Sequence, residues 1–542
     1  MSSNAANIRS ESSEVGRASS APLQLSPVWA ISSEDQGADQ QSESPNQMRT
    51  NRKVRVLAIA AALAAVQFNS IHQACGQNTT NVDVQALIQR VKELEEKVKV
   101  LEHNQEASKE VTKGTNAATV DEQLTQAKKD LPQLIIGQDG FGFKSADGNF
   151  ALKLEGVLQI DSRTFFSDHG IPGNDGFLLR RARPIIEGTV FRDFDFEFIP
   201  DFGTGNNGGN AGTAPSPQIF DAWLNYRYSP ALQLRVGKFK SPIGLEQLQA
   251  DAFLTFNERS LATDLVPNRD LGVMLHGELW EGLLDYAGGI FNGVGDQRNS
   301  PNSAFSDDKA GEGRLFVQPF KRTKVEGLEG FGFGIGGGFG TAFTAAGLPA
   351  TTGGTTPGYA TVGQEQFFAY RSTVTANGEF WHLAPQAFYH WGPVALLGEY
   401  VISDQAVTTG AASRRLENKA WDVTASWVLT GENNTFAGVV PESPFDPKSG
   451  HWGAWELAAR VSQANLDRAA FPIFSDPTTS AHSALEWSFG LNWWLNKNVR
   501  VMTSFSRTTF GGGGGTAVVT TAPSAVTRQP ENTLFTRVQL AF

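Results

Sequence analysis

Arginines at alternating positions are the first feature of this sequence that could do chemistry. The run FLLRRARP (Phe177–Pro184) places Arg181 and Arg183 two residues apart, so in a strand they share one face while Arg180 points to the other. A guanidinium group offers a planar fork of donors that fits phosphate or carboxylate, and it keeps its charge at any working pH. Arginines along a narrow, water-filled passage would give an anion a series of shallow sites to move between.

Further arginines and nearby acids leave two interpretations of this set open. Three more arginines occupy polar positions of alternating segments: Arg163, Arg227 and Arg235. Four acids lie on neighbouring alternating segments: Glu187, Asp195, Glu197 and Asp201. The arginines therefore either line a path for anions or form ion pairs with these acids across strands.

Alternation with a period of two runs from Asn149 to the end of the chain and predicts the elements that hold these residues. In FRDFDFEFIPDFG (Phe191–Gly203) phenylalanines alternate with Asp195 and Glu197, so one face is aromatic and the other anionic. The alternating segments run about ten residues, the length a tilted strand needs to cross a bilayer. A soluble sandwich also alternates, but its inward faces are mostly aliphatic. The recurrence of Trp and Tyr near strand ends favours a lipid interface.

The connections and the C-terminus favour a barrel in the bacterial outer membrane. Tight turns at Ser229-Pro230 and Asn496–Asn498 alternate with long Gly/Thr/Pro-rich loops at residues 347–364 and 511–532. Short turns at one end and long loops at the other are typical of such barrels. The chain ends in TLFTRVQLAF, and its terminal Phe542 resembles the signal that outer-membrane assembly machinery reads. We therefore predict an all-β, antiparallel transmembrane barrel over residues 133–542, with lipid outside and water inside.

The composition excludes several classes of protein. The 542 residues include 37 Phe and 12 Trp but a single Cys, which excludes a disulfide scaffold and a cysteine-based zinc site. No window of about 18 apolar residues is present, which argues against a transmembrane helix. The net charge of −11 argues against nucleic-acid binding.

No catalytic, metal or cofactor site is predicted. His382 and His390 share a parity but lie far apart for metal ligands, and no H-x-x-x-H occurs. The glycine runs at residues 336–338 and 511–515 are not followed by Lys-Ser or Lys-Thr, so they are not phosphate loops. Asp195 and Glu197 could do acid/base work, but no Ser/His pair accompanies them. We expect neither an enzyme nor a cofactor.

The residues before the alternating region divide into three predicted parts. Residues 1–47 are Ser-rich and patternless, which predicts a misassigned start, with Met48 as the true first residue, or a disordered extension. Residues 48–76 predict a signal peptide, with the basic run RTNRKVR, the apolar run VLAIAAALAAV and small residues before a cleavage site. Residues 77–132 predict a periplasmic coiled coil followed by a linker.

The coiled-coil prediction rests on a heptad seam. Six apolar residues follow the spacing of a and d positions: Val84, Leu87, Val91, Leu94, Val98 and Leu101. Arg90 and Lys97 fall at g positions, with Glu95 and Glu102 at the following e positions, where parallel helices pair charges between chains. The seam favours an oligomer, and because three heptads are marginal alone, another interface must hold the subunits together.

Several motifs, in this order, resemble the phosphate-selective porin O and P family. They are FLLRRARPIIEG, FRDFDFEFIPDFG, IFDAWLNYRY, LRVGKFKSPIGLEQL with a following FNERS, WELAARVSQANL, FGLNWWLNKNVRV and the terminal RVQLAF. The resemblance covers about residues 140–542 and is strongest over residues 176–275. It implies a barrel of sixteen antiparallel strands that assembles as a homotrimer. It also implies an anion path lined by arginines, with lysines in a constriction formed by inward-folded loops.

The resemblance adds Lys238 and Lys240 to the pore-lining candidates. They precede the segment Ser241–Arg269, which is expected to fold inward with a helical turn at Leu245–Leu248. Arg181 and Arg183 match the arginine pair of the family's barrel wall, and Glu258-Arg259 resembles a family motif with a structural role. Both lysines equally suit cations placed at lipid headgroups.

These features predict an outer-membrane porin that forms a water-filled channel for passive diffusion of small hydrophilic solutes. The resemblance implies a preference for anions such as phosphate or polyphosphate. The alternative is a structural or adhesive barrel that its coiled coil tethers to the periplasmic wall. An inward-folded loop and lumen cations would favour the channel, whereas a plugged lumen or a stalk that binds peptidoglycan would favour the tether.

Overall fold

The computed structural model describes the barrel and little of what precedes it. It describes residues 131–138, 140–166, 173, 175–203, 217–297, 299–302, 307–323, 325, 327–342, 358–517 and 524–542, together with Glu96 and Lys99. The predicted extension at residues 1–47, the signal peptide at 48–76 and the heptad seam lie outside the described residues, apart from Glu96 and Lys99, which are helical and exposed. Among the described residues, no helix is both long and apolar enough to span a membrane.

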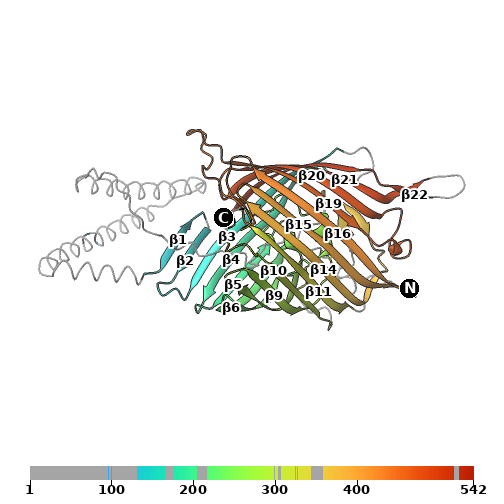
Figure 1. Cartoon of the computed structure of the whole chain (residues 1–542), viewed down its shortest axis with the longest axis horizontal. Coiled ribbons are helices and arrows are strands. Elements are labelled where there is room, and N and C mark those ends of the chain that lie inside the picture. The colour runs from blue at the N-terminus through green and yellow to red at the C-terminus, as the bar shows by residue number, and fades with distance from the viewer. Residues whose placement is uncertain are drawn as a thin grey trace, which may run out of the picture. The chain divides into compact units, whose positions relative to one another are not determined.

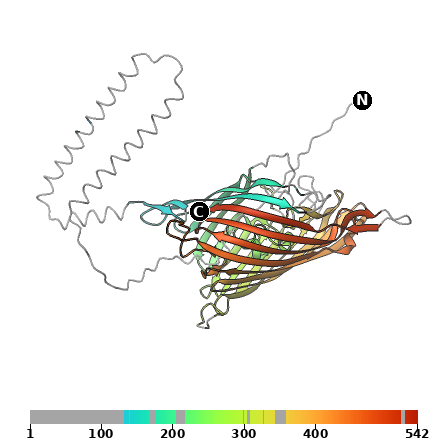
Figure 2. The same cartoon turned by 90° about the horizontal axis from the view of Figure 1, so that it is seen from above.

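Sixteen antiparallel strands close into a ring (Figures 1 and 2). Each ring strand pairs with the next in the chain, and the last, β23, pairs with the first, β3. The ring consists of β3 (Ala151–Phe165), β4 (Gly176–Val190), β5 (Phe194–Asp201), β6 (Gln218–Ser229), β7 (Leu232–Lys240), β8 (Arg269–Leu279), β9 (Leu284–Phe291), β10 (Ala310–Val317), β11 (Phe331–Ala342), β14 (Thr375–Trp391), β15 (Val394–Thr409), β16 (Ala412–Val428), β19 (Ala454–Asn465), β20 (Ala481–Trp494), β21 (Val499–Ala517) and β23 (Glu531–Ala541). Closure satisfies the backbone hydrogen bonds of the ring strands, as lipid requires.

Short elements decorate the ring. They are the hairpins β1 (Gln133–Gly137)/β2 (Gly140–Lys144), β12 (Gly358–Ala360)/β13 (Gln366–Ala369) and β17 (Asn434–Thr435)/β18 (Gly438–Val439), the strand β22 (Ser524–Thr527), the helical turn α4 (Leu245–Leu248), and the 3₁₀ turns η1 (Leu261–Leu265) and η4 (Arg468–Ala470). The hairpin of β1 and β2 lies along the start of β3, where β2 pairs with Ala151–Leu154. β23 pairs with β3 further along, at Val157–Phe165.

The predicted loop at residues 511–532 is partly wrong. β21 continues through the glycine run to Ala517 and pairs there with β22. Gly512, Gly513 and Gly515 have positive φ angles, which glycine adopts without steric cost. The strand therefore continues, and its pairing with β22 is irregular, with a register shift between Gly513 and Thr516.

The barrel wall is apolar outside and polar inside, the reverse of a water-soluble sheet. On β16, Trp427 on the outer face is 53% exposed, whereas Asp422 on the opposite face is 1% exposed. Exposed aromatic residues gather where strands end at the short-turn end: Tyr228, Trp280, Trp391 and Trp427. An apolar outer band with aromatic residues at its edge suits lipid. The predicted transmembrane barrel is confirmed in the described residues.

Connection lengths distinguish the two ends of the barrel. The short-turn end carries connections at residues 191–193, 230–231, 280–283, 318–330, 392–393, 429–453 and 495–498. The long-loop end carries connections at residues 166–175, 202–217, 241–268, 292–309, 343–374, 410–411, 466–480 and 518–530. The tight turns predicted after β6 and β20 are confirmed. The connection at 429–453 is long for its end, and the one at 410–411 is short for its end.

The connection at residues 241–268, hereafter the inward segment, is packed inside the barrel. Its apolar residues are almost fully buried: Leu245, Leu248, Leu254, Leu261 and Leu265. η1 contacts β15, β16 and β19, where small inward residues such as Ala420 and Ala464 leave room for it. Apolar side chains of the segment and alanines of the wall therefore share one core. The predicted inward fold and the helical turn at Leu245–Leu248 are confirmed.

Candidate functional site

Glu258 of the inward segment is held by two arginines of the barrel wall. Arg180 of β4 binds its carboxylate with both nitrogens of a fork, Nε at 2.7 Å from Oε1 and Nη2 at 2.9 Å from Oε2. Arg537 of β23 donates from Nη2 to Oε1 at 2.8 Å and also binds Asp161 with two bonds. All four side chains are at most 5% exposed. Charge-assisted, forked bonds of this kind fix geometry strongly.

Asp251 of the inward segment forms a second centre of ion pairs. Arg183 approaches it at 2.5 Å, Arg259 at 2.6 Å and Arg181 at 3.3 Å. Arg183 also binds Asp201 of β5 at 2.7 Å. We call the wall arginines Arg180, Arg181, Arg183 and Arg537, with Asp251 and Glu258, the arginine latch.

The expected outward direction of Arg180 is wrong, because β4 carries a bulge. In the pairing of β3 with β4, Gln159 faces Arg181 while the next residue, Ile160, faces Leu179. Arg180 is therefore the extra residue, and a bulge re-aims its side chain toward the lumen beside that of Arg181. Local alternation could not reveal this, since the bulge depends on the register of another strand.

The structure separates the seven sequence-predicted cations. Arg181 and Arg183 belong to the latch, and Arg227 pairs with Asp195 at 2.9 Å near the short-turn end. Arg235 lies over the ring of Trp223, and Arg163 lies over that of Phe535. Lys238 donates to Asn302 at 3.1 Å, and Lys240 donates to the carbonyl oxygens of Gln247 and Gln249. The seven residues therefore do not form one continuous ladder.

Sequence reasoning missed several inward arginines: Arg180, Arg269, Arg314, Arg460, Arg500 and Arg537. Arg537 and Arg460 occupy polar positions of alternating strands, so parity alone could have found them. Arg269 binds Asp221 of β6 at 3.0 Å. Arg460 pairs with Glu486 of β20 and donates to the main-chain oxygen of Glu258.

Within the described residues, five buried cations have no carboxylate in ion-pair distance: Arg163, Lys238, Lys240, Arg314 and Arg500. Eight buried acids likewise have no cation in that distance: Asp270, Asp285, Glu312, Glu365, Glu399, Asp422, Glu432 and Glu456. Four of these cations lie on β3, β7 and β21, whereas six of the acids lie on β8, β9, β10, β15, β16 and β19, and Glu365 and Glu432 lie in connections between ring strands. Because ring strands are neighbours in chain order, the two charges occupy different arcs of the wall.

A second segment enters the barrel from the short-turn end. In the connection at residues 429–453, the main-chain oxygen of Phe436 accepts a hydrogen bond from Gln249 of the inward segment at 3.0 Å. The Phe436 ring also lies 5.8 Å from that of Phe388 on β14, and the main-chain oxygen of Asn434 contacts His390. Segments from both ends thus meet inside the barrel and narrow it.

The arginine latch controls the titration of its acids. Burial raises the pKa of the Asp251 carboxyl, but the charges of Arg181, Arg259 and Arg183 outweigh burial and hold this pKa well below its usual value. Burial likewise raises the pKa of Glu258, and Arg180, Arg181 and Arg537 together bring it well below its usual value. Both groups are therefore anionic throughout the physiological range.

We expect the inward segment to stay docked as the pH falls to about 5 and to loosen only below about pH 4. A carboxyl whose folded pKa is depressed contributes stability that is present above its unfolded pKa and is lost as the pH falls through the folded pKa. Trypsin resistance at Arg259 after brief acid exposure, followed with single-channel conductance, measures this. Loosening already between about pH 7 and pH 5 would contradict the assignment of Asp251 and Glu258.

A family model and one curated relative agree on one family. The family model described as "Phosphate-selective porin O and P" matches residues 152–510. Porin O of Pseudomonas aeruginosa is 22% identical over 414 residues, which cover 69% of this chain and 86% of that protein. Among solved structures, the outer membrane channel DcaP of Acinetobacter baumannii has 11% identity and a TM-score of 0.45, covering 74% of this chain and 99% of that one. OmpT of Vibrio cholerae, in its trimer form, has 11% identity and a TM-score of 0.42, covering 72% and 99%.

Proposed function

Because this chain belongs to the phosphate-selective porin O and P family of outer-membrane porins, we propose that it forms a water-filled channel for passive diffusion of small hydrophilic solutes, with a preference for anions such as phosphate or polyphosphate. Four cations of β3, β7 and β21 that have no ion pair within the described residues support the anion preference: Arg163, Lys238, Lys240 and Arg500. Facing charges of opposite sign create a field across a lumen of low-dielectric walls, and anions follow the cationic side.

The candidate cations divide into two roles in this proposal. Arg181 and Arg183 hold the inward segment and so set the width of the channel, because their charges are already engaged by Asp251. Arg163 and Lys238 keep donors available, since among the described residues neither has an ion pair. These two side chains are therefore the proposed contacts for a passing anion.

The proposal includes assembly and location. The chain forms a homotrimer in the outer membrane, exported by the signal peptide at residues 48–76 and extended into the periplasm by the coiled coil at 84–101. Its last strand carries the signal for the assembly machinery. Phe542 supports this role, since it exchanges two main-chain hydrogen bonds with Gly156 and its ring contacts Phe141.

Conductance in planar bilayers under a salt gradient, with phosphate titrated against chloride, tests the function. We expect a reversal potential that favours anions and a chloride current that low phosphate blocks. Replacing Arg163 and Lys238 together with glutamine should weaken the phosphate block about tenfold or more, as losing one or two charge-assisted hydrogen bonds implies.

Arg322→Gln is the matched control, because Arg322 is exposed and pairs with the exposed Glu281 outside the barrel wall. It should leave the block unchanged. A large conductance that is indifferent to phosphate would exclude anion specificity while leaving a general porin. Absence of any conductance would exclude the channel itself.

A further inference from the structure

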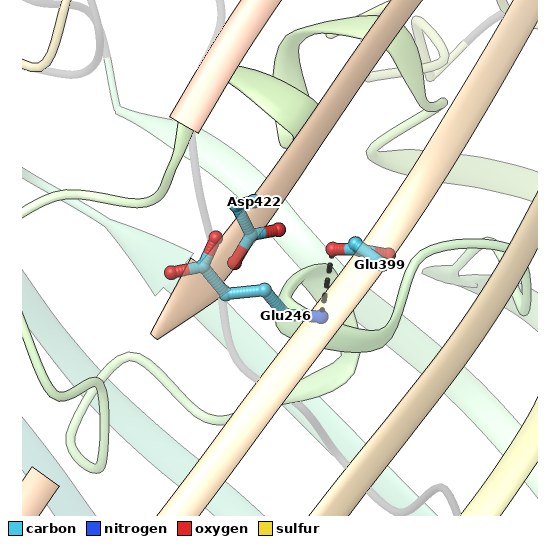
Figure 3. Close-up of side chains that lie close together, drawn as sticks. All are labelled: Glu246, Glu399 and Asp422. Atoms are coloured by element: carbon cyan, nitrogen blue, oxygen red, sulfur yellow. Dashed lines mark hydrogen bonds between the residues drawn. The ribbon is translucent and has the colours of Figure 1, made fainter. Parts of the chain in front are cut away.

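Three buried carboxylates meet where the inward segment contacts the wall (Figure 3). Glu246 comes from α4, Glu399 from β15 and Asp422 from β16, and one carboxylate oxygen of each lies within 4.8 Å of those of the others. Their exposed fractions are 6%, 4% and 1%. Like charges this close in a buried place repel each other strongly unless something positive lies between them.

One carboxylate oxygen of this group has no well-formed hydrogen bond within the described residues. Oδ1 of Asp422 is buried and has no hydrogen-bond partner among the described residues, although Oδ2 accepts from Thr424 at 3.4 Å. The Ser260 hydroxyl lies beside Asp422 and interacts with its carboxylate, although the two groups do not reach good hydrogen-bond geometry. A buried carboxylate oxygen without a well-formed hydrogen bond is costly, which favours a ligand at this place.

Neighbouring cations do not supply the missing charge. Arg460 lies 3.5 Å from Glu246 but is equally close to Glu486, at 3.4 Å, and donates to the main-chain oxygen of Glu258. Within the described residues, no lysine or arginine is in ion-pair distance of Glu399 or Asp422. Glu399 instead accepts the main-chain N–H groups of Leu245 and Glu246. The three acids therefore share part of one guanidinium charge.

We propose that Glu246, Glu399 and Asp422 bind a calcium ion that fastens the inward segment to β15 and β16. Calcium takes six to eight oxygen ligands at about 2.3–2.6 Å, so oxygens on opposite sides of the ion lie about 5 Å apart, close to the spacing found here. Three carboxylates provide three to six of these oxygens, and the Ser260 hydroxyl can add another. Magnesium demands shorter bonds and stricter octahedral geometry, which this irregular set fits less well.

The site complements the arginine latch. The latch joins the inward segment to β4 and β23, whereas the calcium ion joins it to β15 and β16, so the segment is fixed to two separate parts of the wall. The inference does not depend on anion selectivity, because a channel of any selectivity needs its constriction held in place.

Calcium binding to the full-length protein, stripped with EDTA and then freed of it, tests this inference by isothermal titration. We expect one calcium ion per chain, and greater resistance to trypsin at Arg259 once calcium is bound. Asp422→Asn should lower calcium affinity at least about tenfold, since ligand charge sets affinity in such sites. In EDTA the same variant should resist trypsin better than the wild type, because it relieves repulsion among the acids.

Asp285→Asn is the matched control, since Asp285 is a buried wall acid outside this group. It should keep the calcium stoichiometry, and Glu399→Gln provides a second variant if Asp422→Asn fails to fold. No calcium uptake by the wild type, or equal uptake by Asp422→Asn, would overturn the site. If mild acid without calcium protects Arg259 from trypsin as well as calcium does, the site would also be overturned, because protons on the carboxyls would then be enough to relieve their repulsion. All these readouts are independent of conductance.

Discussion

Replacing Glu258 with alanine will release the inward segment from the wall at a cost of about 3–5 kcal/mol in docking free energy, because the change leaves buried charges without their partner. Arg180 and Arg537 are fully buried, and both donate to the Glu258 carboxylate. Without it Arg180 loses both bonds of its fork, and the two guanidinium groups repel each other. The ring should survive, since its strand pairing does not involve the segment.

Trypsin cleavage at Arg259 and single-channel conductance measure this release. The variant should be cut much faster than the wild type, and its conductance should rise and become noisy. Glu187→Ala, on the same strand as Arg180, is the control: Glu187 pairs with Lys153 at 3.2 Å while both are about one-third exposed, so its loss should cost less than about 1 kcal/mol. If Glu258→Ala stays resistant to trypsin, the latch is not what holds the segment.

Deleting residues 243–266 should widen the channel several-fold in conductance and make it more anion-selective. Lys240 and Arg269 face each other at the ends of β7 and β8, so a short glycine-rich turn can join these strands. The deletion removes the acids Glu246, Asp251, Glu258 and Asp264 and the cation Arg259, a net gain of three positive charges. It also uncovers the wall arginines that those acids neutralise.

The reversal potential under a salt gradient is the measurement for this variant. Adding Arg537→Gln to the deletion should reduce the gained anion preference while leaving the wider conductance, because it removes one positive charge from the wall without refilling the lumen. An unchanged conductance after the deletion would show that the inward segment does not narrow the path. A shift toward cations would show that the uncovered arginines do not face it.

The strands could be predicted from the sequence because each ring strand separates lipid from water. Apolar and polar side chains alternate along β5 and β16 because one face meets lipid and the other meets water. The lengths of the connections then predicted which end of the barrel has short turns and which has long loops. The inward segment was also predictable, since the family resemblance placed it and its leucines need a core. The extension of β21 was missed because a glycine run has no side chains to alternate.

The candidate site was only partly predictable. Parity placed Arg181 and Arg183 on one face, but their partner Asp251 lies in a segment that returns from the long-loop end. Arg537 meets Glu258 across 279 positions of sequence, and no local pattern encodes such a contact. The bulge at Arg180 depends on β3, so it reverses a prediction made from β4 alone.

The ring closes by pairing its first strand, β3, with its last, β23. The barrel therefore cannot close before β23 has been made. Until β23 arrives, β3 and β21 each present an open edge that another chain could extend. The hairpin of β1 and β2 already covers the start of β3, and β23 takes the remainder, with Phe542 sealing the junction at Gly156. A chain that lacks β23 could not close the ring, and the unpaired edges of β3 and β21 would favour aggregation. Closure therefore requires the last strand.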